Sequence, residues 1–339
     1  MNYTEEQVKE ATEYFEQNPD AVKFSRKQSG FTHSFIRTSD KDKGLQHDIF
    51  IISRTILGSG SNGVVKIGKN TKTNQIVAIK IILAEDDSDF WFNEVLILSK
   101  LNRLYGTTNR SSIAETKKGW LNKRERLAKY KNDIYNFKNY IFKVFCEGIT
   151  LQEYFLIHNP SNIEIVKILL KILDQLSILH NQGITHGDLN FKNILINNSN
   201  DNFDIEIIDF GLANKVSEEG IRAFPVHQYK FSRDHYLPPE CDYTLSKKLF
   251  DNKPIDNNCL SKILNWAKQG YGFNTATSDT YSLIWSINHF CNRRHQQQDL
   301  FLSYLYNVTC KKSCPILRPS LEEITTECQQ YFEKLSLKP

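Results

Sequence analysis

The sequence predicts an α+β protein in which strands come early in the chain and helices dominate the rest. Between residues 49 and 82 the apolar segments are short and separated by turn residues, which is typical of a small antiparallel sheet. From Asn162 to His180 apolar residues recur at helical spacing, after the capping box Ser161-x-x-Glu164. With 339 residues, 40% of them hydrophobic, the chain can form one large domain of two lobes or two modest domains.

Composition indicates a soluble protein of a reducing compartment. No apolar run approaches the roughly 20 residues that a membrane-spanning helix needs. The first residues are acidic and polar, which is unlike a secretory signal. Seven cysteines, an odd number, are scattered along the chain, which favours free thiols over a disulfide framework. We therefore expect no transmembrane segment and a cytoplasmic location.

Residues 1–46 are expected to form an N-terminal helical extension. Thr4 and Gln7 have the spacing of a capping box, which predicts a helix through Phe15. Val8, Ala11, Tyr14 and Phe15 fall on one stripe of this helix. The stripe predicts that the helix packs on the body of the protein.

Three glycines, Gly58, Gly60 and Gly63, follow an apolar strand pattern. Backbone without Cβ atoms lets amide groups approach a triphosphate closely. Another strand pattern, residues 64–68, follows them. A dinucleotide-binding unit would continue as a helix, so the pattern argues against that class.

A charged residue interrupts the next apolar strand, residues 76–82. A lysine there, Lys80, is costly to bury unless it meets an anion. Ser88 or Asp89 can cap the following helix, and Glu94 stands on its otherwise apolar surface. The sequence therefore predicts a Lys80–Glu94 ion pair.

The loop at residues 186–193 carries an aspartate and an asparagine five positions apart, Asp188 and Asn193. Further motifs follow in order: Asp209-Phe210-Gly211, Pro238-Pro239-Glu240, Asp279 within a predicted helix, and Arg318-Pro319. With the three glycines, Val77-Ala78-Ile79-Lys80 and Glu94, this set resembles the eukaryotic-type protein kinase family over about residues 48–335.

The resemblance implies a bilobal protein-kinase-like fold. Residues 47–146 would form an N-lobe with a small antiparallel β-sheet, and residues 147–339 a mostly helical C-lobe. Glu240 is expected to pair with Arg318, and Asp279 to hold the backbone of the catalytic loop.

The resemblance also implies the site. Asp188 would accept or orient the proton of the substrate hydroxyl, and Asn193 and Asp209 would hold Mg²⁺ or Mn²⁺. Lys80, fixed by Glu94, would contact the α- and β-phosphates of ATP. Adenine and phosphate contacts are assigned to Leu57, Gly58, Gly60, Gly63, Val65, Ala78 and Leu195.

Three departures from the family pattern carry information. Gly187 replaces the arginine that normally clamps a phosphorylated activation loop, which predicts activity without phosphorylation of Ser217, Tyr229 and Ser232. Asn190 stands where Ser/Thr kinases usually carry lysine. Lys192 occupies the place where many tyrosine kinases carry arginine, and it could reach the γ-phosphate.

The expected function is ATP-dependent transfer of phosphate to Ser/Thr hydroxyls of protein substrates, with tyrosine left open. Two alternatives remain at this point: a small-molecule or lipid kinase, since His-Gly-Asp-Leu resembles aminoglycoside and choline kinases, and a pseudokinase scaffold. The divergent motifs also resemble bacterial eukaryotic-like and effector kinases, and a secreted effector would work in the host cytosol. The acceptor and the oligomeric state are not indicated.

Two insertions are expected, at about residues 105–138 and 243–275. Residues 100–140 hold eleven Lys or Arg and three acids. This charge fits a solvated amphipathic helix or a docking surface for an acidic partner, such as a phosphoinositide membrane surface, an acidic protein or a nucleic acid.

Overall fold

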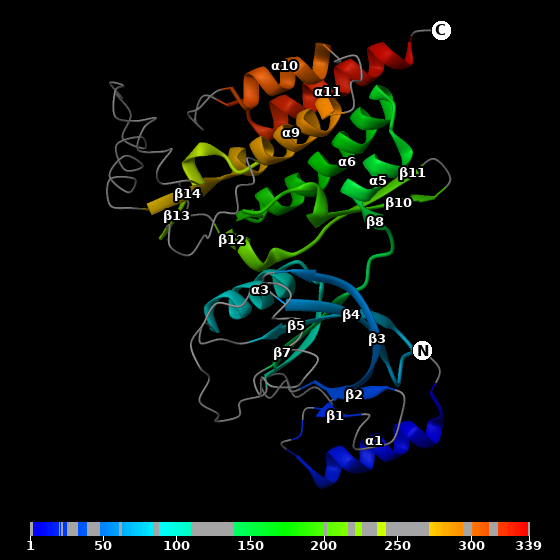
Figure 1. Ribbon diagram of the computed structural model, residues 1–339. Helices are drawn as coiled ribbons and strands as arrows, with labels where there is room; N and C mark the ends of the chain where they lie inside the picture. Colours follow the sequence, from blue (N-terminus) through cyan, green and yellow to red (C-terminus); the bar gives the residue numbers. More distant parts are fainter. Residues whose placement is uncertain are drawn as a thin grey trace. The chain divides into compact units, whose positions relative to one another are not determined.

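The chain divides into two compact units, Met1–Cys146 and Glu147–Pro339, and each is described by itself. The computed structural model (Figure 1) describes residues 3–19, 21, 23–25, 33–38, 48–60, 63–83, 88–109, 138–199, 202–215, 221–225, 236–241, 271–293, 300–311 and 318–337. In these residues strands dominate the first unit and helices the second, so the α+β class is as predicted.

The first unit is built on a seven-stranded antiparallel sheet in the order β1-β2-β3-β4-β5-β7-β6. The strands are β1 (Lys23–Phe24), β2 (Ser34–Arg37), β3 (Ile49–Gly60), β4 (Gly63–Asn70), β5 (Ile76–Leu83), β6 (Leu104–Asn109) and β7 (Lys138–Val144). Neighbours in sequence pair through short connections from β3 to β5, as the turn residues between them predict.

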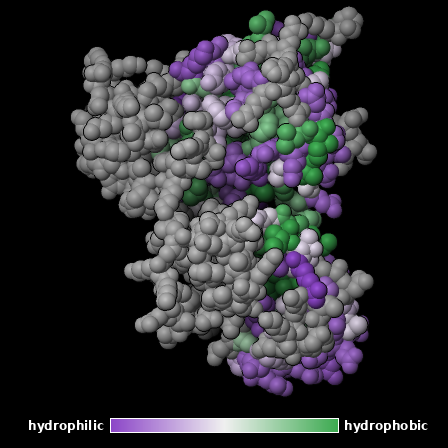
Figure 2. Space-filling view, in the orientation of Figure 1, coloured by the Kyte–Doolittle hydropathy of each residue, from purple (hydrophilic) through white to green (hydrophobic). Residues whose placement is uncertain are grey.

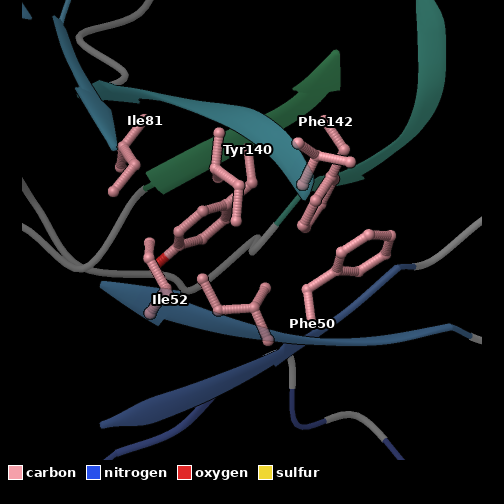
Figure 3. Close-up of a cluster of buried hydrophobic side chains, with 8 residues drawn as sticks. Phe50, Ile52, Ile81, Tyr140 and Phe142 are labelled. Atoms are coloured by element: carbon pink, nitrogen blue, oxygen red, sulfur yellow. The ribbon is translucent and has the colours of Figure 1, made fainter. Parts of the chain in front are cut away.

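One face of this sheet carries an aromatic and aliphatic core (Figure 3). Phe50 and Phe142 meet at a ring separation of 4.6 Å, and Ile52, Ile81 and Tyr140 complete the labelled set. Because side chains alternate along a strand, the residues between them point to the opposite face. This alternation separates the core face from the face that carries Lys80.

The opposite face is covered, at the β1-β2-β3 end, by α1 (Glu5–Gln17). The capping box predicted for Thr4 and Gln7 is present. Ala11 and Phe15 of α1 are buried with residues of β1, β2 and β3, namely Phe24, Phe35, Ile49 and Ile51. The outward side of the helix is charged, and it is the purple surface at the bottom of Figure 2. The extension is therefore part of the first unit's fold, and it adds two short strands that the sequence did not predict.

The polypeptide between α3 (Ser88–Lys100) and β7 returns to the sheet before any insertion begins. Residues 104–109, five of which the sequence assigned to the insertion at 105–138, form the edge strand β6. The predicted basic helix near residues 120–134 lies outside the described part of the chain.

The second unit is organised around the helix α6 (Asn162–Asn181), which begins at the predicted capping box of Ser161 and Glu164. Its buried stripe packs against α11 (Leu321–Ser336) and β11 (Asn202–Ile207). The other helices are α5 (Leu151–His158), α9 (Ala276–Arg293) and α10 (Leu300–Thr309). Across the described ranges, no helix combines the length and the apolar character that a bilayer crossing requires.

Three small antiparallel sheets border these helices. They are β11-β10-β8, β12-β9 and β13-β14, built from β8 (Ile149–Thr150), β9 (Ile184–Thr185), β10 (Ile194–Ser199), β12 (Asn214–Lys215), β13 (Ile221–Pro225) and β14 (Tyr271–Thr275). The last pair joins two segments about 50 residues apart, and β14 covers the end of the insertion expected at 243–275. Residues 242–270 lie outside the described ranges.

Candidate functional site

The first unit buries one ion pair. Lys80 on β5 and Glu94 on α3 are 3% and 1% exposed, and the Lys80 Nζ lies 2.7 Å from the Glu94 Oε2. The pairing predicted from the sequence is therefore present. Two buried opposite charges stabilise each other, whereas either one alone would be an uncompensated charge in a low-dielectric interior. The pair fixes the lysine side chain against the sheet.

Register places three predicted contact residues on one sheet face. Val65 is the cross-strand partner of Lys80, and Ala78 precedes Lys80 by two positions. Directly paired residues and residues two apart in a strand share a face, so Val65, Ala78 and Lys80 point the same way. This face is opposite the Phe50–Phe142 core and carries the only full charge of the three. Leu57, before the glycines, is 46% exposed.

The glycine positions form the tip of the β3–β4 hairpin, where Gly58 pairs with Val65 and Gly60 with Gly63. Gly63 has φ +129°, and a Cβ there would collide with the carbonyl oxygen of Ile81. Packing alone therefore requires glycine at this position. At Gly58, by contrast, no heavy atom lies within 4 Å of the place of a Cβ. This open space beside backbone amides fits a phosphate group.

In the second unit, the start of the loop at residues 186–193 is fixed by one buried carboxylate, that of Asp279 on α9, which is 1% exposed. It accepts hydrogen bonds from the backbone nitrogens of His186 (2.8 Å) and Gly187 (2.9 Å), as predicted, and lies 3.0 Å from the His180 Nε2. Burial alone would raise the pKa of Asp279, but the His180 hydrogen bond, the histidine charges and the His186 backbone bond hold it below its usual value.

The backbone conformation at Gly187, next to Asp279, accounts for the glycine at this position. Its φ of +76° lies in the left-handed region, where a side chain is strained. The backbone turns there so that two successive amides reach the same carboxylate. The glycine that replaces the family's arginine is thus fitted to this turn.

Asp188 follows directly and is surrounded by neutral donors. The Asn193 Nδ2 donates to its backbone oxygen (2.8 Å) and its Oδ2 (3.0 Å), and the Asn190 Nδ2 donates to its backbone oxygen (3.1 Å) and its Oδ1 (3.3 Å). The Tyr236 hydroxyl donates to the same Oδ1. Burial raises the pKa of Asp188 and the Asp209 charge adds to this, while the bonds from Tyr236 and Asn193 and the nearby His186 oppose it.

Asp209 is joined to this loop through the backbone. The Ile208 nitrogen donates to the Asn193 carbonyl oxygen (2.9 Å), and the Ile208 carbonyl lies 3.0 Å from the His186 Nε2. Asp209 itself has φ +64°, which costs a non-glycine residue on the order of 1–3 kcal/mol. Backbone strain of this kind is common at functional sites, where it fixes the direction of a side chain. At Asp209 it occurs next to the residue whose backbone binds the loop at residues 186–193.

Asn193 and Asp209 fit a divalent metal that also binds phosphates. The amide nitrogen of Asn193 donates to Asp188, which leaves the amide oxygen of Asn193 as a possible metal ligand, and Asp209 supplies a carboxylate. No group of three or more His, Cys, Asp or Glu suited to a metal occurs in the described part of the chain. Mg²⁺ and Mn²⁺ are commonly held by one or two protein oxygens with the remainder from phosphates and water.

The remaining predicted site residues lie on the same short stretch. Lys192 is exposed in η1 (Phe191–Asn193), and its backbone nitrogen donates to the Asn190 Oδ1 (3.0 Å). Leu195 is half-buried on β10, where it faces away from the buried Ile194 and Ile196. Ser217, Tyr229 and Ser232 lie outside the described residues.

A second buried ion pair braces this unit. The Arg318 guanidinium binds both oxygens of Glu240 at 2.5 and 2.7 Å, as predicted. The Ser278 hydroxyl donates to the Glu240 Oε1 (2.8 Å), which links the pair to the start of α9, one residue before Asp279. A bidentate bond of this kind fixes the Pro238-Pro239-Glu240 segment in one geometry.

Sequence reasoning missed two residues at Asp188. Asn190 was noted only as a departure from lysine, and the contact made by Tyr236 was not foreseen. A polar residue two positions after Asp188 was the one available signal for Asn190. Nothing in the local pattern signals Tyr236, because its contact spans 48 positions.

Comparison with known proteins agrees with this geometry. The model of the family "Protein kinase domain" matches residues 52–256, more than half of the chain. The chain belongs to the protein kinase family.

The relatives it resembles are also named as kinases. A Caenorhabditis elegans protein named as a serine/threonine-protein kinase is 23% identical over 256 residues, which cover 74% of this chain and 57% of the relative. Protein kinase kin1 of Schizosaccharomyces pombe is 26% identical over 57% of this chain and 22% of its own length. Human mitogen-activated protein kinase kinase kinase kinase 3 is 27% identical over 51% and 17%. The chain thus matches only part of each of these relatives.

Proposed function

We propose that this protein is an ATP-dependent protein kinase that transfers the γ-phosphate to hydroxyl groups of proteins, serine and threonine before tyrosine. The observation that carries the proposal is the state of Asp188. Its carboxylate accepts hydrogen bonds from neutral donors and lies near Asp209, whose backbone is strained. The backbone just before it is fixed by hydrogen bonds to Asp279. Its raised pKa suits a group that accepts a proton from an acceptor hydroxyl.

The residues of each unit have separate tasks in this proposal. In the first unit Lys80, fixed by Glu94, binds the α- and β-phosphates, and the glycine backbone lies along the triphosphate. Leu57, Val65 and Ala78 provide apolar contacts for adenine, and Leu195 is assigned the same task from its own unit. Lys192, exposed beside Asp188, is assigned to the γ-phosphate.

The acceptor chemistry belongs to the second unit. Asp188 receives the hydroxyl proton as the acceptor oxygen bonds to the γ-phosphorus, while the bond from that phosphorus to the β–γ bridging oxygen breaks and ADP leaves. Asn193 holds Asp188 in place through its amide nitrogen. Asn193 and Asp209 would hold Mg²⁺ or Mn²⁺, which when bound neutralises phosphate charge and orients the leaving group. The serine and threonine preference is supported by the name of the Caenorhabditis elegans relative, a serine/threonine-protein kinase.

One incubation tests this function. The protein is mixed with γ-labelled ATP, Mg²⁺ or Mn²⁺ and generic protein acceptors, and the labelled acceptors undergo phosphoamino-acid analysis. Label on phosphoserine and phosphothreonine is the expected result. Label only on small molecules, or ATP binding with no transfer, would contradict it and would support a small-molecule kinase or a scaffold instead.

We also propose that the basic residues between 100 and 140 bind an acidic partner. Eleven positive and three negative residues give this segment a local charge of 11 − 3 = +8. Reversing four of them, Lys123, Arg124, Arg126 and Lys129, should weaken binding to phosphoinositide vesicles, with a four-residue neutral substitution as the matched control. Unchanged binding to vesicles and to acidic proteins would end this proposal.

A further inference from the structure

The carboxylate of Asp188 is unevenly occupied. Its Oδ1 accepts two hydrogen bonds, from the Tyr236 hydroxyl and from the Asn190 Nδ2, while its Oδ2 accepts one, from the Asn193 Nδ2. A carboxylate offers roughly four acceptor positions, two on each oxygen. Among the described residues, Oδ1 is therefore filled and Oδ2 keeps one position for a further donor.

The backbone of Tyr236 is restrained by the fixed position of Glu240 a few residues later. Four residues later, Glu240 is fixed by Arg318 (2.7 Å) and Ser278 (2.8 Å). The two prolines between them restrict the backbone dihedral angles. The backbone of Tyr236 therefore has little freedom to move, and its hydroxyl has a defined place on Oδ1.

The donors on Oδ1 also differ from the family pattern in charge. Asn190 stands where serine/threonine kinases usually carry a lysine, and the segment before Pro238 lacks the usual Gly-Thr pair. An asparagine amide and a tyrosine hydroxyl orient a carboxylate without neutralising it.

On the strength of the proposed protein kinase function, we propose that Tyr236 is a positioning residue for phosphoryl transfer. Its hydroxyl, together with Asn190, fixes the Oδ1 of Asp188, so that the open position on the Oδ2 faces the acceptor hydroxyl. A competing interpretation is that the Tyr236 hydroxyl imitates an acceptor and blocks the site. The open position on Oδ2 favours positioning, because an acceptor can bind Asp188 while Tyr236 stays in place.

The test compares two tyrosine variants in steady-state transfer from ATP to a protein acceptor. Tyr236→Phe removes only the hydroxyl, and we expect kcat to fall by about 10- to 100-fold, the effect of losing one hydrogen bond to a charged group. The KM for ATP and the thermal unfolding midpoint should stay at the wild-type values. Tyr304→Phe on α10, where the ring is 43% exposed, is the matched control and should leave kcat unchanged.

A second background separates positioning from a structural role. In Asp188→Asn, followed over long incubations with labelled ATP, Tyr236→Phe should change the residual rate less than twofold, because the carboxylate through which it acts is absent. An equal fall in both backgrounds overturns the proposal, as does a wild-type kcat in Tyr236→Phe. A raised kcat, or phosphate found on Tyr236 of the wild type by mass spectrometry, overturns it in favour of an acceptor mimic.

The two proposals fail in different ways. If the wild-type protein labels no protein acceptor, the kinase function fails and the role of Tyr236 falls with it. If the wild type labels protein and Tyr236→Phe labels it equally well, only the role of Tyr236 is overturned.

Discussion

Two carboxylates, the buried Glu94 in the first unit and the half-buried Asp188 in the second, show opposite treatments of a negative charge. Glu94 faces the ammonium of Lys80 at 2.7 Å. Asp188 is given only neutral donors by the described residues around it, two asparagine amides and one tyrosine hydroxyl. The first arrangement cancels charge, and the second orients it.

This difference indicates what each carboxylate is for. A charge that is cancelled works as a brace, which fits the proposal that the Lys80 side chain is held in place to bind phosphates. A charge that is oriented but not cancelled keeps its affinity for a proton, as a catalytic base requires. Burial raises the pKa of Asp188 against the opposing hydrogen bonds, and this direction agrees with the second role.

The largest effect is expected at Asp188. Asp188→Ala removes the proposed base and should lower transfer to a protein acceptor by about 10²- to 10⁴-fold. ATP affinity, measured by titration of a fluorescent analogue, should remain within a few-fold of wild type, because the phosphate contacts are assigned elsewhere. A variant that transfers phosphate at the normal rate would falsify the comparison with Glu94.

Lys80 should affect both stability and activity. Lys80→Met leaves the Glu94 charge buried without its partner, which should lower the free energy of unfolding by about 3–5 kcal/mol in chemical denaturation. Transfer should be lost as well. The double variant Lys80→Met with Glu94→Leu should recover most of the stability and none of the activity. If the single and double variants are equally stable, the pair does not brace the unit.

Asp279 should produce a pH-dependent effect. Its pKa is lowered in the folded state, so its contribution to stability is fully present above the unfolded value of about 3.9 and is lost as the pH falls through the lower folded value. Asp279→Asn should therefore be less stable than wild type from pH 7 to about 4, and the difference should narrow below that. Urea midpoints at pH 7, 4 and 3 measure this; a difference that widens in acid would contradict the assignment.

The smallest effect is expected in the activation segment. Position 187 is a glycine and not the arginine that would bind a phosphorylated loop. Residues 221–225 also have a fixed partner, because they pair with residues 271–275. Replacing Ser217, Tyr229 and Ser232 together by alanine should leave most of the transfer activity. Phosphatase-treated wild type serves as the control and should also stay active. Near-complete loss in both samples would show dependence on phosphorylation.

Local chemistry made much of this fold predictable. The capping boxes at Thr4 and Ser161 predict the starts of α1 and α6. A lysine inside an apolar strand predicts a nearby acidic partner, which is Glu94. Each of these signals lies within about 15 residues of its consequence. The Glu240–Arg318 pair and the role of Asp279 were predictable only through the resemblance to the kinase family, since they join distant segments.

The features that were not predicted depend on long-range pairing. The two-residue strand β1 has no periodicity of its own, and it exists because β2 offers it an edge. The β13–β14 pair and the Tyr236–Asp188 contact likewise connect segments whose approach is fixed by the rest of the unit. Sequence patterns report local preference, and none of these contacts is local.

The packing of α1 sets the boundary of the folded unit. The family match begins at residue 52, which is in the middle of β3. A chain trimmed there would lose α1, β1, β2, Ile49 and Ile51, so the whole apolar cluster between α1 and the sheet would be lost. It would also remove Ile36 and Phe50 from the core cluster that contains Phe142. Recombinant versions of this kinase should therefore start before Thr4, because the smallest piece that folds is longer than the piece that is recognisable.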